Sequence, residues 1–120
     1  MLYIEEGVRD TAWSVSEWFM KEYLSNHRVF ISVEERDLSE EGVDGWCIKE
    51  TENEFLIQID KNLEYDYIPT LLHELYHILQ WLEGKKQDEY ECMSMELPLY
   101  EEYMGRFRQT TWQVLEQTLE

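Results

Sequence analysis

The sequence has few of the residues that cross-link or interrupt a small fold. It contains two cysteines, two prolines and five glycines in 120 residues. Cys47 and Cys92 are far apart and form no C-x-x-C pair, which excludes a disulfide framework and a four-cysteine zinc site. The prolines and glycines are scattered and form no linker, and the chain has no internal repeat. We therefore expect one domain over residues 1–120.

Basic residues are also scarce. The chain has 10 Lys and Arg against 27 Asp and Glu, a formal net charge of −17. Because phosphate groups are bound by clustered Lys and Arg, this composition argues against direct contact with nucleic acid and against docking on an anionic membrane. A hydrophobic fraction of 43%, with 14% aromatic residues, argues against a disordered acidic tail.

Long apolar runs are absent as well. No stretch approaches the ~20 residues of a membrane span. The first residues, Met1 to Glu6, carry no basic segment followed by an apolar one, as a signal peptide does. We therefore expect a cytoplasmic protein.

The spacing of the apolar residues predicts an α+β fold. Steps of three and four predict one helix over about 8–25 and another over about 69–83, with Pro69 at its first position. Alternating apolar residues predict a strand over 28–34, a short apolar run predicts one over 46–48, and residues 55–60 are the clearest strand in the chain. We expect two or three of these strands to form a mainly antiparallel sheet.

A further helix follows the turn at Gly84. Asp88 is its expected N-cap, and Pro98 either kinks this helix or begins a new one over 99–119.

The helix over 69–83 contains the pattern H-E-x-x-H. His73 and His77 are four residues apart, so on a helix they share one face and can bind one zinc ion. Glu74 is one position further round the helix, where it would lie beside a water bound to the zinc. Zinc lowers the pKa of such a water to about 7. Glu74 is therefore the candidate general base. The motif takes up two of the three histidines in the chain. The alternative is a pair of packed core histidines beside a solvated glutamate.

A catalytic zinc site commonly has three protein ligands and one open position. The helices on either side of the short turn at Gly84 are expected to be antiparallel neighbours. His77 precedes Gly84 by seven residues and Glu91 follows it by seven, which places the two at similar heights. Glu91 is therefore the first candidate for the third ligand, Glu89 the second and Glu96 the third. The alternative for each is a surface carboxylate.

Other side chains are less favoured for the metal or for the reaction. Cys92 is either a thiolate ligand or, as we favour, a small core residue that lets the two helices approach. His27, near the end of the first helix, is a further alternative for the third ligand. Candidate donors to an oxyanion are Tyr90, Tyr100, Tyr103 and Arg106, and nothing in the sequence selects one of them.

The strand over 55–60 has a second interpretation. If it is an edge strand beside the motif helix, it can pair with an extended peptide by strand addition. The alternative is that it is simply the best-formed strand of the sheet.

These residues resemble the zincin metallopeptidases. The run from Leu71 to Gln80, LLHELYHILQ, is typical of small single-domain gluzincins and SprT-like proteins of bacteria and phages, and Glu91 followed by Cys92 resembles the gluzincin third-ligand segment. The resemblance covers about 8–105. It implies an N-terminal helix, a small three-stranded, mainly antiparallel sheet, the H-E-x-x-H helix, an antiparallel ligand helix and a C-terminal helix. The chain lacks the third histidine of metzincins and the basic tail of SprT-like repair proteases, which argues against DNA-linked proteolysis.

The leading hypothesis is a zinc-dependent metallopeptidase that hydrolyses a peptide or protein substrate. His73, His77 and Glu91 would bind Zn²⁺, and Glu74 would act as general base. The acidity of the chain would favour a basic substrate. The alternative is an acidic interaction protein that imitates the charge of DNA, or a zincin without activity, and that binds a basic protein partner.

Overall fold

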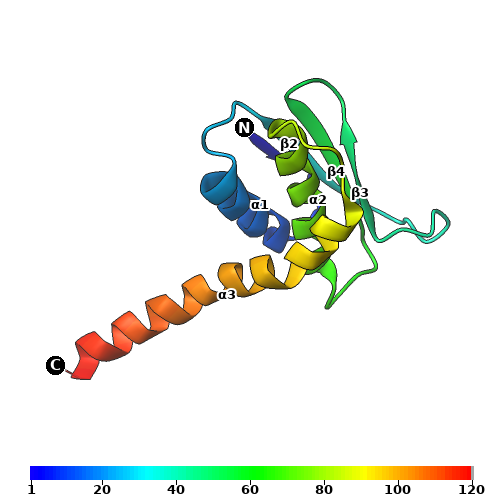
Figure 1. Ribbon diagram of the computed structural model, residues 1–120. Helices are drawn as coiled ribbons and strands as arrows, with labels where there is room; N and C mark the ends of the chain where they lie inside the picture. Colours follow the sequence, from blue (N-terminus) through cyan, green and yellow to red (C-terminus); the bar gives the residue numbers. More distant parts are fainter. Residues whose placement is uncertain (120) are drawn as a thin grey trace.

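The computed structural model describes residues 1–119, with side chains as far as Arg106 (Figure 1). Its elements in chain order are β1 (Leu2–Ile4), α1 (Asp10–Tyr23), β2 (Phe30–Arg36), β3 (Gly45–Lys49), β4 (Glu54–Asp60), α2 (Tyr67–Leu82) and α3 (Glu89–Leu119). Three helices and one four-stranded sheet in this part of the chain confirm the α+β class.

The sheet is mixed, and the expected three-stranded, mainly antiparallel sheet is wrong. The strand order is β1-β2-β4-β3, in which β1 pairs with β2 and β2 with β4 in parallel. Only β3 and β4, the two arms of a hairpin, are antiparallel. Alternation of apolar residues predicts a strand but not its direction. The three-residue β1 is too short to show any alternation, so no pattern of residues marks it.

Strand β4 lies inside the sheet. It pairs with β2 on one side, where Ile57 is opposite Val33, and with β3 on the other, where Ile57 is opposite Cys47. The interpretation of strand 55–60 as an edge strand is therefore wrong. The edges are β1 and β3, and β3 is the edge that contacts α2.

The helices begin and end close to the expected residues. Pro69 lies in the first turn of α2, where its missing N–H would have no partner within the helix. Asp88 caps α3, because its Oδ1 accepts a hydrogen bond from the Glu91 backbone N–H at 3.1 Å, as expected. Within residues 1–119, no helix is both long and apolar enough to cross a membrane.

Helix α3 continues through Pro98 to Leu119, so the separate C-terminal helix is a wrong prediction. Proline removes one backbone hydrogen bond, which packing on either side can offset. Leu99 and Tyr103, just after the proline, are buried against the rest of the fold. Beyond them α3 extends away from the other elements (Figure 1).

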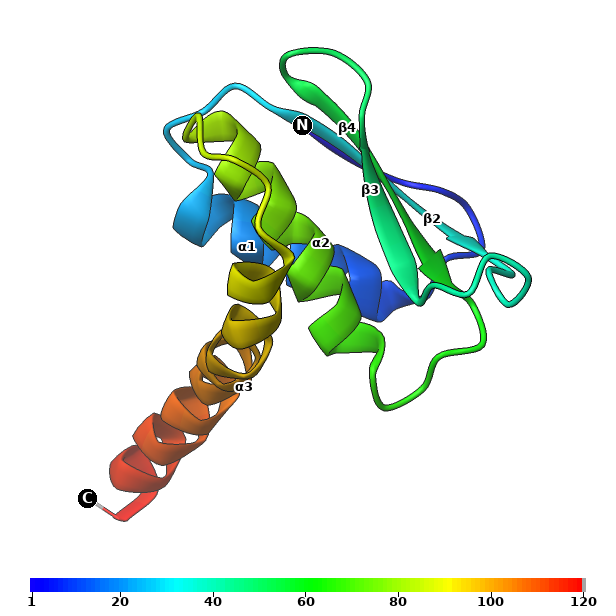
Figure 2. The same ribbon diagram turned by 45° about the vertical axis from the view of Figure 1, so that its right-hand side comes forward.

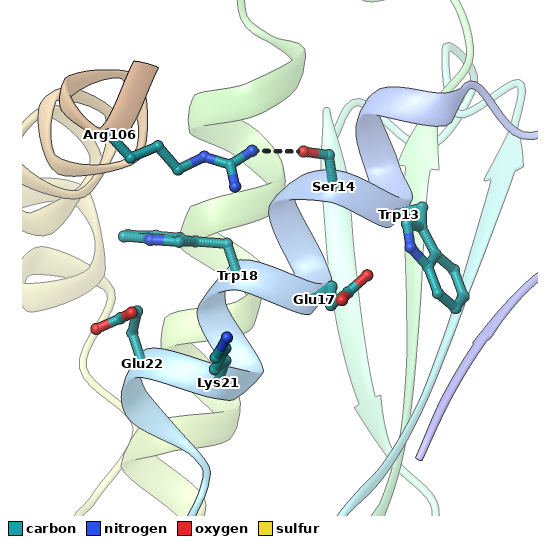
Figure 3. A pocket seen from close by; sticks show the side chains of 7 residues that line it. All are labelled: Trp13, Ser14, Glu17, Trp18, Lys21, Glu22 and Arg106. Carbon is teal, nitrogen blue, oxygen red and sulfur yellow. Dashed lines mark hydrogen bonds between the residues drawn. The ribbon is translucent and has the colours of Figure 1, made fainter. Parts of the chain in front are cut away.

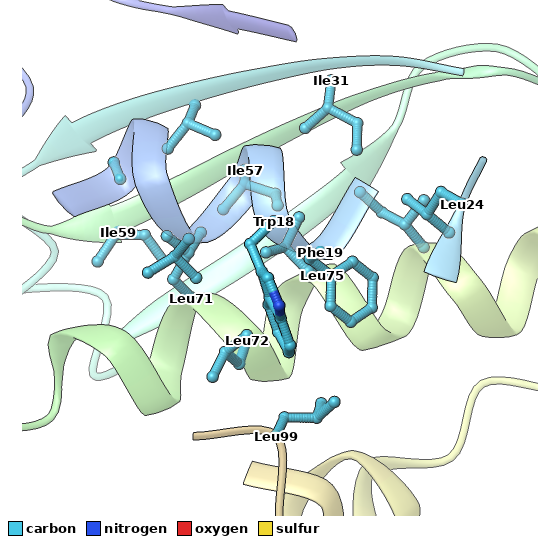
Figure 4. Close-up of a cluster of buried hydrophobic side chains, with 14 of the residues drawn as sticks. Trp18, Phe19, Leu24, Ile31, Ile57, Ile59, Leu71, Leu72, Leu75 and Leu99 are labelled. Carbon is cyan, nitrogen blue, oxygen red and sulfur yellow. The ribbon is translucent and has the colours of Figure 1, made fainter. Parts of the chain in front are cut away.

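The core lies between one face of the sheet and helices α1 and α2 (Figure 2). Phe55, Ile57 and Ile59 alternate along β4 and are buried on that face. Helix α2 contacts α1, α3, β3 and β4, so it is covered on several sides, as its apolar surface predicts. Side chains of this cluster from both helices, the sheet and α3 include Trp18, Phe19, Ile31, Leu71, Leu72, Leu75 and Leu99 (Figure 4).

We expect Leu71→Ala to lower the free energy of unfolding by about 2–5 kcal/mol, because it leaves a cavity in this core. Leu97→Ala is the matched control, since Leu97 lies on α3 with 63% of its surface exposed. It should change stability by less than about 0.5 kcal/mol. Urea unfolding followed by tryptophan fluorescence measures both, and equal effects would contradict this description of the core.

Candidate metal centre

The two histidines of the motif lie on the face of α2 that meets the beginning of α3. Their rings are 5.1 Å apart between centroids, and both side chains are largely buried. The carboxylate of Glu89, in the first turn of α3, meets both rings. One of its oxygens lies 2.9 Å from His73 Nε2 and the other 2.8 Å from His77 Nε2.

The opposite nitrogen of each ring also faces an oxygen acceptor. His73 Nδ1 is 2.8 Å from Glu96 Oε2, and His77 Nδ1 is 2.6 Å from Gln87 Oε1. A carboxylate or amide oxygen accepts, so each Nδ1 carries the proton that it donates. A neutral imidazole then has no second proton for Nε2. Either both rings are protonated, or a cation belongs where the two Nε2 lone pairs and the Glu89 carboxylate converge.

The donor types suit a zinc ion, since two imidazole nitrogens and one carboxylate are a common catalytic set, with one position left open. The two contacts use different oxygens of the Glu89 carboxylate. The hydrogen bonds from Nδ1 to Glu96 and Gln87 are also the outer contacts that orient metal-binding histidines.

Glu91, the first candidate for the third ligand, is turned away from the histidines. Its Oε1 accepts a hydrogen bond from Gln80 Nε2 at 3.0 Å. Successive helical residues are about 100° apart, so Glu91 points about 200° round the axis from Glu89. His77 and Glu91 would face each other only across a tight turn that presented Glu91 to α2, whereas residues 83–88 form a non-helical connection. Glu89, the second candidate, takes the place expected for Glu91.

Glu89, Cys92 and Glu96 form one stripe on α3. Their spacing of three and then four residues places them on a single helical face. All three contact the histidine pair: Glu89 and Glu96 as described above, and Cys92 through its sulfur, 3.4 Å from His77 Nδ1. The third candidate, Glu96, therefore contacts His73 at Nδ1 and is not placed beside the Nε2 atoms.

Gln80 fixes α3 against α2, a role that sequence reasoning missed. It is 1% exposed, its Nε2 donates to the Asp88 carbonyl and to Glu91, and its Oε1 accepts from the Asp88 N–H. Gln80 follows His73 by seven residues and so continues the polar stripe of the two histidines. The seven-residue spacing from His73 to Gln80 was the sequence feature that could have indicated this role. No comparable signal marked Gln87, which lies in the connection between the helices.

Glu74 is buried without a partner. It is 6% exposed, and no hydrogen bond or ion pair joins its carboxylate to another described residue. Burial raises the pKa of Glu74 to about 7; His73 opposes this shift, whereas the negative charges of Glu89 and Glu96 add to it. Burial alone would lower the pKa of His73, but the carboxylates of Glu96, Glu74 and Glu89 outweigh that effect and raise it. A buried carboxylate beside two imidazoles is suited to proton transfer near neutral pH.

Cys92 offers a second set of metal ligands with the same histidines. Atoms of His73, His77 and Cys92 that can bind a metal lie within 4.8 Å of one another. The thiol is 0% exposed, and burial, followed by nearby carboxylates, raises its pKa to about 12. A bound dication would deprotonate a coordinating thiol, so this pKa does not decide between the two ligand sets. We favour Glu89 over Cys92 because its carboxylate meets the Nε2 atoms of both rings, whereas the Cys92 sulfur lies 3.4 Å from His77 Nδ1.

The remaining candidates lie elsewhere in the fold. His27 is in the turn after α1, where its N–H donates to the Leu24 carbonyl. Tyr90 is exposed and Tyr100 packs on the core. Tyr103 and Arg106 both turn to Ser14 on α1, at 2.6 and 2.8 Å, and not to the histidines. Arg106 lines a cavity of about 380 Å³ between α1 and α3 (Figure 3). The oxyanion donor therefore stays unassigned.

No protein-family model, curated protein or solved structure matches this chain. The resemblance to zincin metallopeptidases therefore depends on the motif residues and on the geometry around them. Function has to be argued from that geometry, because a fold alone does not imply an activity.

We expect the Cys92 thiol to react slowly in the folded protein, because it is buried and neutral. In Cys47→Ser, Cys92 is the only thiol, since the chain has two cysteines. After chelator treatment at neutral pH, Ellman's reagent should modify it at least ~100-fold more slowly than in urea. Equal rates in the folded and unfolded protein would show that Cys92 is accessible and would weaken its assignment to the core.

Proposed function

We propose that this protein is a zinc-dependent peptidase in which His73, His77 and Glu89 bind Zn²⁺ and Glu74 is the general base. The observation that carries the proposal is the Glu89 carboxylate, which meets the Nε2 atoms of both histidines at 2.8–2.9 Å while both Nδ1 atoms are already engaged. When bound, zinc would polarise the scissile carbonyl and make a coordinated water acidic enough to attack near neutral pH.

The outer residues of the site hold the two rings in the form that binds a metal. Glu96 and Gln87 accept hydrogen bonds from Nδ1 of His73 and His77, which leaves each Nε2 as the atom with a free lone pair. Gln80 fixes the first turn of α3 and so keeps Glu89 opposite the rings. Glu96 from α3, Gln87 from the connection before it and Gln80 from α2 thus support the two histidines.

Glu74 supplies the proton transfer. Its carboxylate would take a proton from the attacking water and then deliver it to the leaving amine. Burial favours its protonated form and so makes it able both to accept and to return a proton near neutral pH. Its lack of an internal partner leaves both oxygens available to a water or to a substrate.

The edge strand β3 supports an extended peptide as the substrate. It pairs with β4 alone among the described strands, so its other side offers free backbone N–H and C=O groups. It also contacts α2. A peptide added along this edge would pass the motif helix, with main-chain hydrogen bonds providing affinity.

The second candidate function is binding of a basic protein without proteolysis. The net charge of −17 favours it, since the metal site needs only a few of the 27 acidic residues. A surface of this charge attracts basic partners over distances near the Debye length. In this case Glu74 would be dispensable.

For the ligand set, we expect purified wild-type protein, prepared without chelator, to contain about one zinc per chain. Glu89→Ala should weaken zinc affinity by more than the ~10–100-fold typical of changes outside the ligand shell, because it removes a ligand. Glu91→Ala should leave affinity nearly unchanged, because Glu91 is bonded to Gln80. Elemental analysis and competition with a chromophoric chelator measure both quantities.

Cys92→Ala separates the two ligand sets and should retain zinc. Loss of zinc in Cys92→Ala but not in Glu89→Ala would assign the third ligand to the thiol. A wild-type protein that binds no zinc would overturn the proposed function.

For catalysis, we expect Glu74→Gln to lower kcat/KM on a mixed peptide substrate by at least ~100-fold while zinc content is retained, because the amide cannot take the proton. Glu64→Gln, an exposed glutamate just before α2, is the control and should keep full activity. A zinc-loaded wild type that binds a basic protein but hydrolyses no peptide would favour the second candidate function.

A further inference from the structure

Two cavities adjoin the histidine pair from opposite ends. The first, of about 410 Å³, is called here the Asp44 cavity, and its lining residues are Val43, Asp44, Gly45, Thr70, His73, Glu74, Glu89 and Glu96. The second, of about 210 Å³, is called the Trp81 cavity, and its lining residues are Cys47, Glu74, His77, Trp81, Gln87 and Glu89. Both include Glu74 and Glu89, while His73 belongs to one and His77 to the other. The proposed reaction centre therefore lies between them.

The Asp44 cavity is lined by negative charge. Asp44, Glu74, Glu89 and Glu96 contribute carboxylates to it, and none of its lining residues is Lys or Arg. Zinc would neutralise Glu89 in the proposed site, and Glu96 accepts from His73. Glu74 is 6% exposed and unpaired, and Asp44 makes no side-chain hydrogen bond or ion pair with another described residue. Glu74 has its proposed role as general base, so a positively charged side chain that enters this cavity would pair with the exposed Asp44.

The Trp81 cavity has an aromatic wall. Trp81 stacks on Phe55 with ring centroids 5.5 Å apart, and its other neighbour is His77 at 6.1 Å. The neutral Cys47 thiol lies on the opposite side, and burial keeps its pKa well above the usual value. A wall held by stacking on the core, together with a neutral sulfur, favours an apolar side chain.

Edge strand β3 relates the two cavities to each other. Gly45 lines the first and Cys47 the second, and residues two apart on a strand face the same way. A Cβ on Gly45 would come within 3.0 Å of Ile59 and of Thr70 on α2, and Cys47 packs against the core, so both positions face α2. A peptide paired along β3 would therefore place side chains two positions apart into the two cavities.

We propose that the substrate is a peptide with a Lys or Arg side chain in the Asp44 cavity and an apolar side chain, two positions away, in the Trp81 cavity. This proposal rests on the proposed peptidase function. The scissile bond is one of the two peptide bonds between these two residues. Asp44 is the specificity-determining residue, because it is the lining carboxylate that has neither an internal partner nor a role at the metal. The same geometry serves a peptide running in either direction along β3.

The test uses binding as well as cleavage. Fluorescein-labelled peptides carrying Leu-Ala-Lys or Lys-Ala-Leu, and the same peptides with Glu in place of Lys or Ser in place of Leu, are titrated into zinc-loaded Glu74→Gln. Anisotropy should show at least about tenfold tighter binding of one Lys peptide than of its Glu counterpart. The preferred order of Leu and Lys reports the direction of the peptide, and kcat/KM of the wild type should follow the same preference.

Charge reversal at Asp44 tests whether the Lys or Arg side chain of the substrate lies in the Asp44 cavity. Asp44→Lys should abolish the preference for Lys over Glu, whereas Glu41→Lys, the same charge change on the same loop but outside the cavity, should retain it. Asp44→Asn is the milder variant if the reversal disturbs folding, and it should weaken the preference. Cys47→Met, which fills the Trp81 cavity, should remove the preference for Leu over Ser.

The outcomes separate this proposal from the one on which it rests. Hydrolysis of Lys and Glu peptides at equal rates, with zinc bound, would overturn the specificity and leave the peptidase function intact. A Lys preference that Glu41→Lys and Asp44→Lys reduce equally would reflect overall charge and would also overturn it. Binding that depends on Asp44 without any hydrolysis would instead contradict the peptidase function.

Discussion

The packing of α2 on several sides is the constraint on which the site depends. Its apolar residues contact the sheet, α1 and α3, and three of its polar side chains lie along the contact with the beginning of α3. His73, His77 and Gln80 occupy that contact, and buried polar groups are stable only with partners. The connection after α2 and the first turns of α3 supply them, through Gln87, Glu89 and Glu96. Core packing and site geometry therefore follow from the same helix–helix contact.

The sequence was sufficient where a local pattern determines the structure. The helical spacing around His73 and the capping role of Asp88 needed no knowledge of distant residues. The residue of α3 that meets the histidine rings could not be predicted in this way. Whether Glu89 or Glu91 meets the rings depends on where α3 begins and how it is rotated, and Gln80 fixes both through contacts across the interface. The direction of the strands could not be predicted from the sequence for a related reason. The parallel pairing of β2 with β4 places β3 at the edge, and no periodicity within a strand carries that information.

Several negative charges around the histidines have no Lys or Arg beside them among the residues that line the cavity. Glu74, Glu89 and Glu96 lie near one another, no Lys or Arg lines the cavity that they share, and their mutual repulsion contributes to the raised pKa of Glu74. Such a cluster opposes folding unless a cation offsets it. A dication between the Nε2 atoms and Glu89 would relieve the repulsion and would bind α2 to α3. Metal binding and the docking of α3 are therefore expected to stabilise each other.

The charge of the whole chain and the charge of the Asp44 cavity act over different distances. A net charge of −17 creates a field that salt screens beyond about 8–10 Å, so it affects how fast a basic partner arrives more than which residue it presents. The exposed Asp44 and the buried Glu74 act at contact distance beside the proposed reaction centre, where charges are closer than the screening length and position matters. Salt should therefore reduce the rate of association with any basic protein and leave the choice between Lys and Glu next to the scissile bond largely intact. That difference distinguishes a site that selects a side chain from a surface that only attracts opposite charge.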